Sequence, residues 1–93
     1  MLTHIVLVRF DNMADAEEGV RQLRAMKGRI PSMTDVEAGI DITRSGRSYE
    51  LALITRHADQ AGLDAYQTHP VHQEVLVFLR AKSSGSVSVD FES

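Results

Sequence analysis

Four stretches of the chain carry the hydrophobic pattern of a β-strand. The first runs from Thr3 to Phe10, is rich in β-branched residues, and contains neither Gly nor Pro. In an extended chain, Ile5 and Leu7 lie on one face, and the other face carries His4, Val6, Val8 and Phe10. Since both faces are largely apolar, this stretch is predicted to be a central strand.

Three later stretches complete the predicted sheet. Apolar and polar residues alternate from Val36 to Ile42, and a nearly continuous apolar run covers Tyr49 to Arg56. The turn between them, Arg44 to Ser48, is short, so an antiparallel hairpin is expected. Alternation returns from Val87 to Phe91, after a serine-rich segment, 83–86, that is expected to be a loop.

Apolar residues three and four positions apart predict a first helix. Its stripe consists of Ala16, Val20, Leu23 and Met26. Asp15 and Glu18 have the spacing of an N-terminal cap, and the helix is expected to end near Gly28. Gly19 lies inside this helix at a cost of about 1 kcal/mol relative to Ala, so either the cost is tolerated or another element packs close there.

Two further helices are predicted on either side of a proline. Asp59 can cap a short helix that continues through Tyr66, and His69-Pro70 interrupts it because proline disfavours helical geometry in the preceding residue. Pro70 suits the first turn of a last helix, with the peptide bond trans and His69 before or at the cap. The apolar stripe of this helix is Val71, Val75, Phe78 and Leu79.

The predicted order is β-α-β-β-α-β, an α+β fold in which helices cover one face of an antiparallel, ferredoxin-like sheet. We expect residues 1–93 to form a single domain, because 93 residues are too few for two cores. The sheet face with Ile5 and Leu7 is apolar and has no helix to cover it. A homodimer through this face is therefore expected.

Composition and charge exclude several kinds of partner and several kinds of active site. The net charge is −3, so nucleic acid is not an expected partner. The chain has no cysteine, which excludes disulfides, thiolate nucleophiles and thiolate metal sites. No export signal is recognised, and the apolar runs are far shorter than the roughly 20 residues of a membrane helix. These features predict a cytoplasmic protein with no membrane partner.

The candidate chemistry lies around His69-Pro70-Val71-His72, with Tyr66 just before it and His4 on the first strand. A helix N-terminus disfavours a protonated imidazole, so His72 could serve as a general base, and the Tyr66 hydroxyl could stabilise an oxyanion. The competing interpretation is structural, with His69 as a cap and Tyr66 as a core aromatic. A metal site using Glu74 or His4 is disfavoured, because no familiar ligand motif is present. His57 is expected to be a solvated loop residue.

Three blocks of sequence resemble the stress-responsive α/β-barrel (Dabb) domain family. They are His4-Ile5-Val6-Leu7 with Phe10, then Ile30-Pro31 with Val36 and Gly39, and Ala65-Tyr66-Gln67-Thr68-His69-Pro70-Val71-His72; Val89-Asp90-Phe91 closes the match. The resemblance implies a dimeric α+β barrel. It extends to plant polyketide cyclases that work without metal or cofactor, which implies His72 as base and Tyr66 as its assistant. It further implies a pocket lined by His4, His69, Val6, Val20 and Leu23.

The chain also departs from those cyclases, which carry bulky aromatic residues on the first helix where this sequence has Gly19, Val20 and Leu23. The linear tetraketide that those cyclases close is therefore not the expected substrate of this chain. Two functions stay open: a cofactor-free cyclase- or lyase-like enzyme for a small apolar carbonyl compound, and a non-catalytic dimeric stress-response or ligand-binding protein. A monooxygenase of the same superfamily is disfavoured, because nothing beyond the fold indicates oxygen chemistry.

Overall fold

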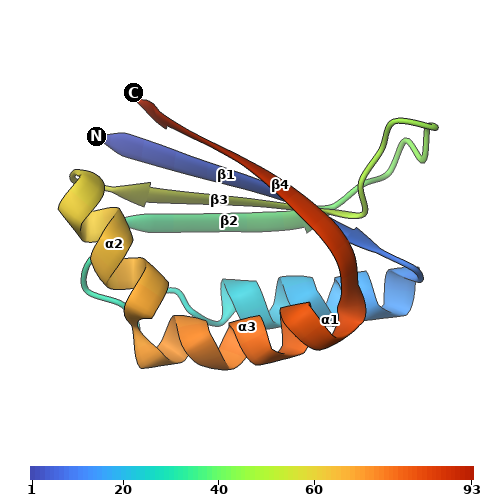
Figure 1. Cartoon of the computed structure of the whole chain (residues 1–93), viewed down its shortest axis with the longest axis horizontal. Helices are drawn as coiled ribbons and strands as arrows, with labels where there is room; N and C mark the ends of the chain where they lie inside the picture. Colours follow the sequence, from blue (N-terminus) through green and yellow to red (C-terminus); the bar gives the residue numbers. More distant parts are fainter.

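One face of a four-stranded antiparallel sheet carries the helices, and the other face is bare (Figure 1). The computed structural model describes all 93 residues. The elements, in chain order, are β1 (Leu2–Phe10), α1 (Met13–Arg24), β2 (Asp35–Ile40), β3 (Leu51–His57), α2 (Gln60–Thr68), α3 (Pro70–Lys82) and β4 (Ser83–Glu92). The predicted ferredoxin-like α+β fold is confirmed.

The strands are arranged in the order β2-β3-β1-β4, so the first strand is central, as its two apolar faces predict. On β1, His4 lies opposite Thr55 of β3 and Asp90 of β4. Opposed residues share a face, so these three polar residues lie together on the side that the helices cover.

The core lies between this side of the sheet and the helix layer. Helix α1 buries Ala16, Val20 and Leu23, and α3 buries Val75 and Leu79. These residues pack against Val8, Phe10, Leu51 and Leu53 of the sheet, and the burial of this apolar surface stabilises the fold. Gly19 of α1 is also buried, and the side chains of Phe10, Leu51 and Leu79 surround the place that a Cβ would occupy there.

The chain breaks between α2 and α3 as predicted. His69 is extended, its side chain caps α3, and Pro70 occupies the first turn of that helix. No peptide bond in the chain is cis. The prediction of an interruption with a trans bond at Pro70 is therefore confirmed.

Several predicted element ends are wrong by a few residues. Helix α1 is capped by Asn12, whose side chain accepts from the Asp15 amide, so Asp15 is a first-turn residue rather than the cap. The helix ends at Arg24, and irregular turns continue through Gly28, where φ is +77°. Strand β2 ends at Ile40. Segment 83–86 is not a loop, because its backbone pairs with β1 and begins β4.

The bare side of the sheet, which we call the open face, is apolar along its centre. The pairing registers place these side chains there: Ile5, Leu7, Ala52, Ile54, Val87, Val89 and Phe91. Leu7 is 38% exposed and Val89 is 62% exposed, which is unusual for contiguous aliphatic residues in a monomer. None of the helices has the length and apolar character needed to cross a membrane.

Candidate functional site

The break at His69-Pro70 brings two predicted site residues into contact. Tyr66 lies in the last turn of α2, on its buried face, and His72 lies in the first turn of α3, with their ring centroids 4.2 Å apart. On a continuous helix the two side chains would point about 120° apart. The extended His69 reorients the chain between them, and its Nδ1 accepts a hydrogen bond of 3.1 Å from the Val71 amide.

Two more histidines surround the Tyr66 ring. The ring centroid of His57 lies 5.0 Å away and that of His4 lies 6.2 Å away, edge-on to the tyrosine. All four rings are buried: Tyr66 and His57 are fully inaccessible, His72 is 5% exposed and His4 is 7% exposed. The cluster joins β1, β3, α2 and α3 beneath the sheet. His69, at the start of α3, is only half-buried.

His72 has one committed nitrogen and one free nitrogen. Its Nδ1 donates a hydrogen bond of 3.1 Å to the Gln67 carbonyl, and Nε2 makes no hydrogen bond within the chain. Burial lowers the pKa of His72 below its ordinary value of 6.5, although the bond to Gln67 acts in the opposite direction. A neutral ring with its proton on Nδ1 keeps a lone pair on Nε2, as a general base requires.

The Tyr66 hydroxyl is buried and has no hydrogen-bond partner. An unpaired buried hydroxyl costs roughly 1–3 kcal/mol, so native structures seldom keep one. Burial raises the pKa of Tyr66, which keeps the phenol protonated at neutral pH. The side chain is therefore a hydrogen-bond donor without an acceptor, in contact with an imidazole that has a free lone pair.

Asp90 is a site residue that sequence reasoning missed. Its carboxylate hydrogen-bonds Nδ1 of His4, which fixes that ring on the helix side of β1. The exposed Asp90 and the buried His4 lie 86 positions apart in sequence, and only the pairing of β1 with β4 brings them together. The alternation of the last strand predicts that Asp90 lies on the other sheet face from Val89 and Phe91, but it does not predict which histidine lies beside Asp90.

The prediction that His57 is a solvated loop residue is wrong. His57 ends β3, and the alternation of that strand turns its side chain into the interior, where none of it is exposed. Nδ1 donates to the Ser32 carbonyl at 2.8 Å, so in the neutral ring Nε2 accepts from the Thr55 hydroxyl at 2.9 Å. Burial lowers the pKa of His57. With both nitrogens committed, His57 supports the Tyr66 ring rather than supplying a base.

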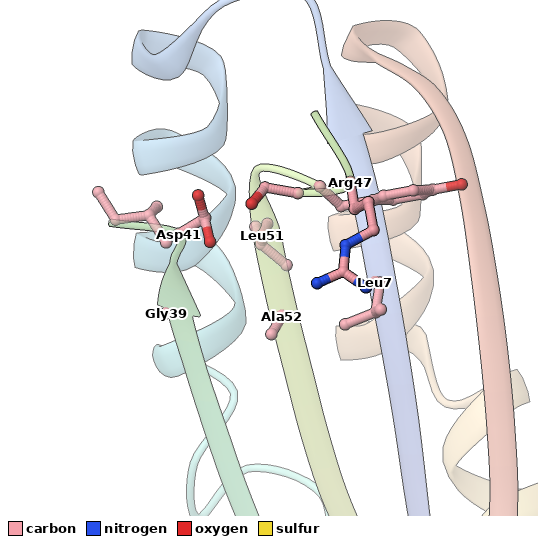
Figure 2. Close-up of a pocket in the computed structure, with 9 residues that line it drawn as sticks. Leu7, Gly39, Asp41, Arg47, Leu51 and Ala52 are labelled. Atoms are coloured by element: carbon pink, nitrogen blue, oxygen red, sulfur yellow. The ribbon is translucent and has the colours of Figure 1, made fainter. Parts of the chain in front are cut away.

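The predicted pocket-lining aliphatic residues lie in the protein interior. Val20 and Leu23 belong to the hydrophobic core, and Val6 packs partly buried against it. The larger hollows lie elsewhere: one of about 390 Å³ on the open face beneath loop 41–50 (Figure 2), and one of about 410 Å³ beside α1 and β2. Nowhere do three or more His, Cys, Asp or Glu side chains form a group that could hold a metal ion.

Comparison with known proteins identifies relatives over the full length of the chain. The family model described as the stress responsive A/B barrel domain matches residues 2–93. No protein of curated function matches the sequence.

Solved structures share the fold. A dimeric ferredoxin-like protein of unknown function from Jannaschia sp. CCS1 is 27% identical, with 99% of this chain and 98% of that chain covered and a TM-score of 0.80. A second such protein, from Thermobifida fusca YX, is 24% identical over 99% of this chain and 90% of that chain, with a TM-score of 0.87. Hydroxynitrile lyase from Passiflora edulis is 13% identical over 97% and 90%, with a TM-score of 0.80. At this identity the lyase shares the fold and nothing more is implied.

Proposed function

Because the chain belongs to the stress-responsive A/B barrel domain family, we propose that it is a homodimeric, cofactor-independent enzyme that abstracts a proton next to a carbonyl group. The observation that carries this proposal is the pairing of two uncommitted groups, the free Nε2 of His72 and the unpartnered hydroxyl of Tyr66, on rings 4.2 Å apart. A base and a hydrogen-bond donor in contact are the two groups that enolisation needs.

In the proposed reaction, Nε2 of His72 removes a proton from the carbon next to the substrate carbonyl. The C–H electron pair moves into the carbonyl group, which becomes an enolate, and the negative oxygen accepts a hydrogen bond from Tyr66. The enolate carbon can then attack a second carbonyl within the same substrate, whose oxygen takes the proton back from Nε2 of His72, or the enolate carbon can itself be reprotonated by His72. The protein supplies both groups, so the chemistry balances without metal or cofactor.

A strip of polar residues on β4 gives a substrate a route to the buried cluster from one side of the sheet. Ser86, Ser88 and Asp90 face the helix side of the sheet, yet all three residues are exposed in the single chain. Asp90 links this strip to the buried cluster through His4. A small carbonyl compound could therefore approach the cluster along β4, with polar contacts from the serine hydroxyls.

The homodimer rests on the open face. Its contiguous apolar side chains would be covered by the same face of a second copy, and relatives with this fold are described as dimeric. Such interfaces usually bury about 2,000 Å² or more. Two sheets packed face to face in this way would also form the barrel that the family name describes.

A second candidate function follows from how tightly the four rings pack. His72 and His4 are at most 7% exposed, and none of the larger hollows reaches Tyr66. A packed ring cluster would also suit a non-catalytic dimeric protein in which His72 and Tyr66 stabilise the junction of α2 and α3.

The exchange of substrate α-protons with solvent distinguishes the proposed enzyme from the non-catalytic protein. Simple 1,3-diketones and β-keto thioesters would be incubated in D₂O, and loss of the α-proton signal would be followed by NMR with and without protein. The enzyme proposal expects acceleration that His72→Ala abolishes and that Tyr66→Phe reduces by roughly 10²–10³.

Val75→Ala is the matched control for stability. Val75 is 7% exposed on the same helix, so its truncation costs roughly 2 kcal/mol without touching the pair. If no compound exchanges faster with protein, and His72→Ala lowers stability as Val75→Ala does, the non-catalytic function replaces the enzyme.

A further inference from the structure

The β2–β3 connection, residues 41–50, is the one loop that rises from the sheet on the side away from the helices (Figure 1). It carries Ile42, which is 91% exposed and is the most exposed large hydrophobic side chain of the molecule. An isolated exposed aliphatic residue is ordinary. This one stands on a segment that projects past the apolar open face, where a second sheet would lie.

The loop is held in a defined shape. The Arg44 guanidinium contacts the Glu50 carboxylate at 2.6 Å and the Asp41 carboxylate at 3.2 Å, and the Arg44 amide donates to Asp41 at 2.6 Å. Arg44 has a φ of +51°, a left-handed conformation that non-glycine residues seldom adopt without such contacts. Glu50 is 7% exposed and also accepts from the Phe10 amide at 2.7 Å, which anchors the loop to β1.

The inner side of the loop continues the open face. The hollow of about 390 Å³ beneath it is lined by Leu7 and Ala52 of the sheet and by Ile40, Arg47 and Tyr49 near or within the loop. Figure 2 shows Arg47 reaching over the strands on the side of Leu7. The loop and the apolar sheet surface therefore form one continuous concave surface rather than two separate patches.

We infer that loop 41–50 is a preformed arm that packs against the second copy of the chain, with Ile42 buried against the partner subunit. The occupant is a second copy because the hollow is continuous with the open face, and this inference rests on the homodimer proposed above. Twofold symmetry places two such arms in each dimer. Preforming the loop through Arg44 and Glu50 lowers the entropy lost when the arm becomes ordered against its partner.

The dimer dissociation constant tests the arm, measured by sedimentation of a dilution series for Ile42→Ser and for Val77→Ser. Val77 is the matched control, since it is 70% exposed but lies on α3, in the helix layer. Ile42→Ser is expected to raise the dissociation constant roughly 100-fold, about tenfold from each symmetry-related contact. Val77→Ser is expected to leave it within about twofold. Where dissociation falls below detection, the rate of subunit exchange gives the same comparison.

Cross-linking gives a second readout, because the chain has no cysteine and Ile42→Cys therefore carries a single thiol. A photoreactive group on residue 42 should yield a covalent species of twice 10.3 kDa, and the same group on Val77→Cys should not. A dimeric wild type with unchanged dissociation in Ile42→Ser would overturn the arm and leave the homodimer intact. A wild type that is monomeric at every concentration would overturn both.

Discussion

Gly19 provides a direct test of how closely α1 packs on the sheet. A Cβ added at this position would lie 3.1 Å from Cδ1 of Leu51, 3.4 Å from Cζ of Phe10 and 3.5 Å from Cδ2 of Leu79. The last two distances are close to ordinary van der Waals contact, whereas 3.1 Å is too short. Leu51 is only 1% exposed, so its methyl group must shift by a few tenths of an ångström against packed neighbours.

Two effects of opposite sign decide the result of Gly19→Ala. Replacing glycine by alanine inside a helix stabilises it by about 1 kcal/mol. Overpacking a buried site costs typically 1–3 kcal/mol. With one short contact, we expect a net loss of about 1 kcal/mol in the free energy of unfolding. Gly19→Val adds two more carbon atoms and is expected to lose about 3 kcal/mol.

Urea denaturation at a fixed protein concentration measures these changes. The matched comparison is Gly19→Ala combined with Leu51→Val, which shortens the side chain that the new Cβ meets. The double variant should be more stable than the sum of the single changes by about 1 kcal/mol. If Gly19→Ala instead stabilises the protein by the full helix preference, the close approach of α1 to β3 does not constrain this position.

Two further outcomes follow from the same structure. Leu7→Asp places a carboxylate in the centre of the open face, so sedimentation at micromolar concentration should show a poorly folded monomer; an intact dimer would refute the sheet-to-sheet interface. The pKa values of His57 and His72 lie below 6.5 in the folded chain, so unfolding takes up protons below that pH. The stability they contribute is present above about pH 6.5 and is lost as the pH falls through their folded pKa values. Urea titrations at pH 7.5 and 5 should show this loss of unfolding free energy. In His72→Gln, the free energy of unfolding should change less steeply with pH, by up to about 1.4 kcal/mol per pH unit. The same pH dependence in both proteins would contradict this expectation.

Local pattern sufficed for most of the fold. The alternation in β1 and the three- and four-residue spacing in α1 are short-range signals, and the restriction that Pro70 places on His69 acts within two residues. These parts agree with the structure. The ends of elements agreed less well, since Asn12 and Asp15 are both good cap residues and only the turn geometry selects Asn12.

Long-range pairing explains what the sequence could not reveal. The serines at 83–86 have the composition of a loop, yet their backbone hydrogen bonds to β1 make them a strand. His57 is buried because the Ser32 carbonyl and the Thr55 hydroxyl satisfy both of its nitrogens. Asp90 reaches His4 only through the register of β4 on β1. Apart from the bond between Thr55 and His57 within β3, each of these contacts joins segments far apart in the sequence, whose proximity no local pattern records.

A base at His72 must be neutral with its lone pair on Nε2, so the protonation state of this ring decides whether it can act as proposed. Long-range ¹H–¹⁵N correlation spectra of the ¹⁵N-labelled protein, recorded across pH 5 to 8, report both the tautomer and the pKa of each imidazole. We predict that His72 is neutral at pH 7 with its proton on Nδ1, donated to Gln67, and that its pKa lies below 6.5. A His72 ring that is charged at pH 7, or that carries its proton on Nε2, would rule out His72 as the base.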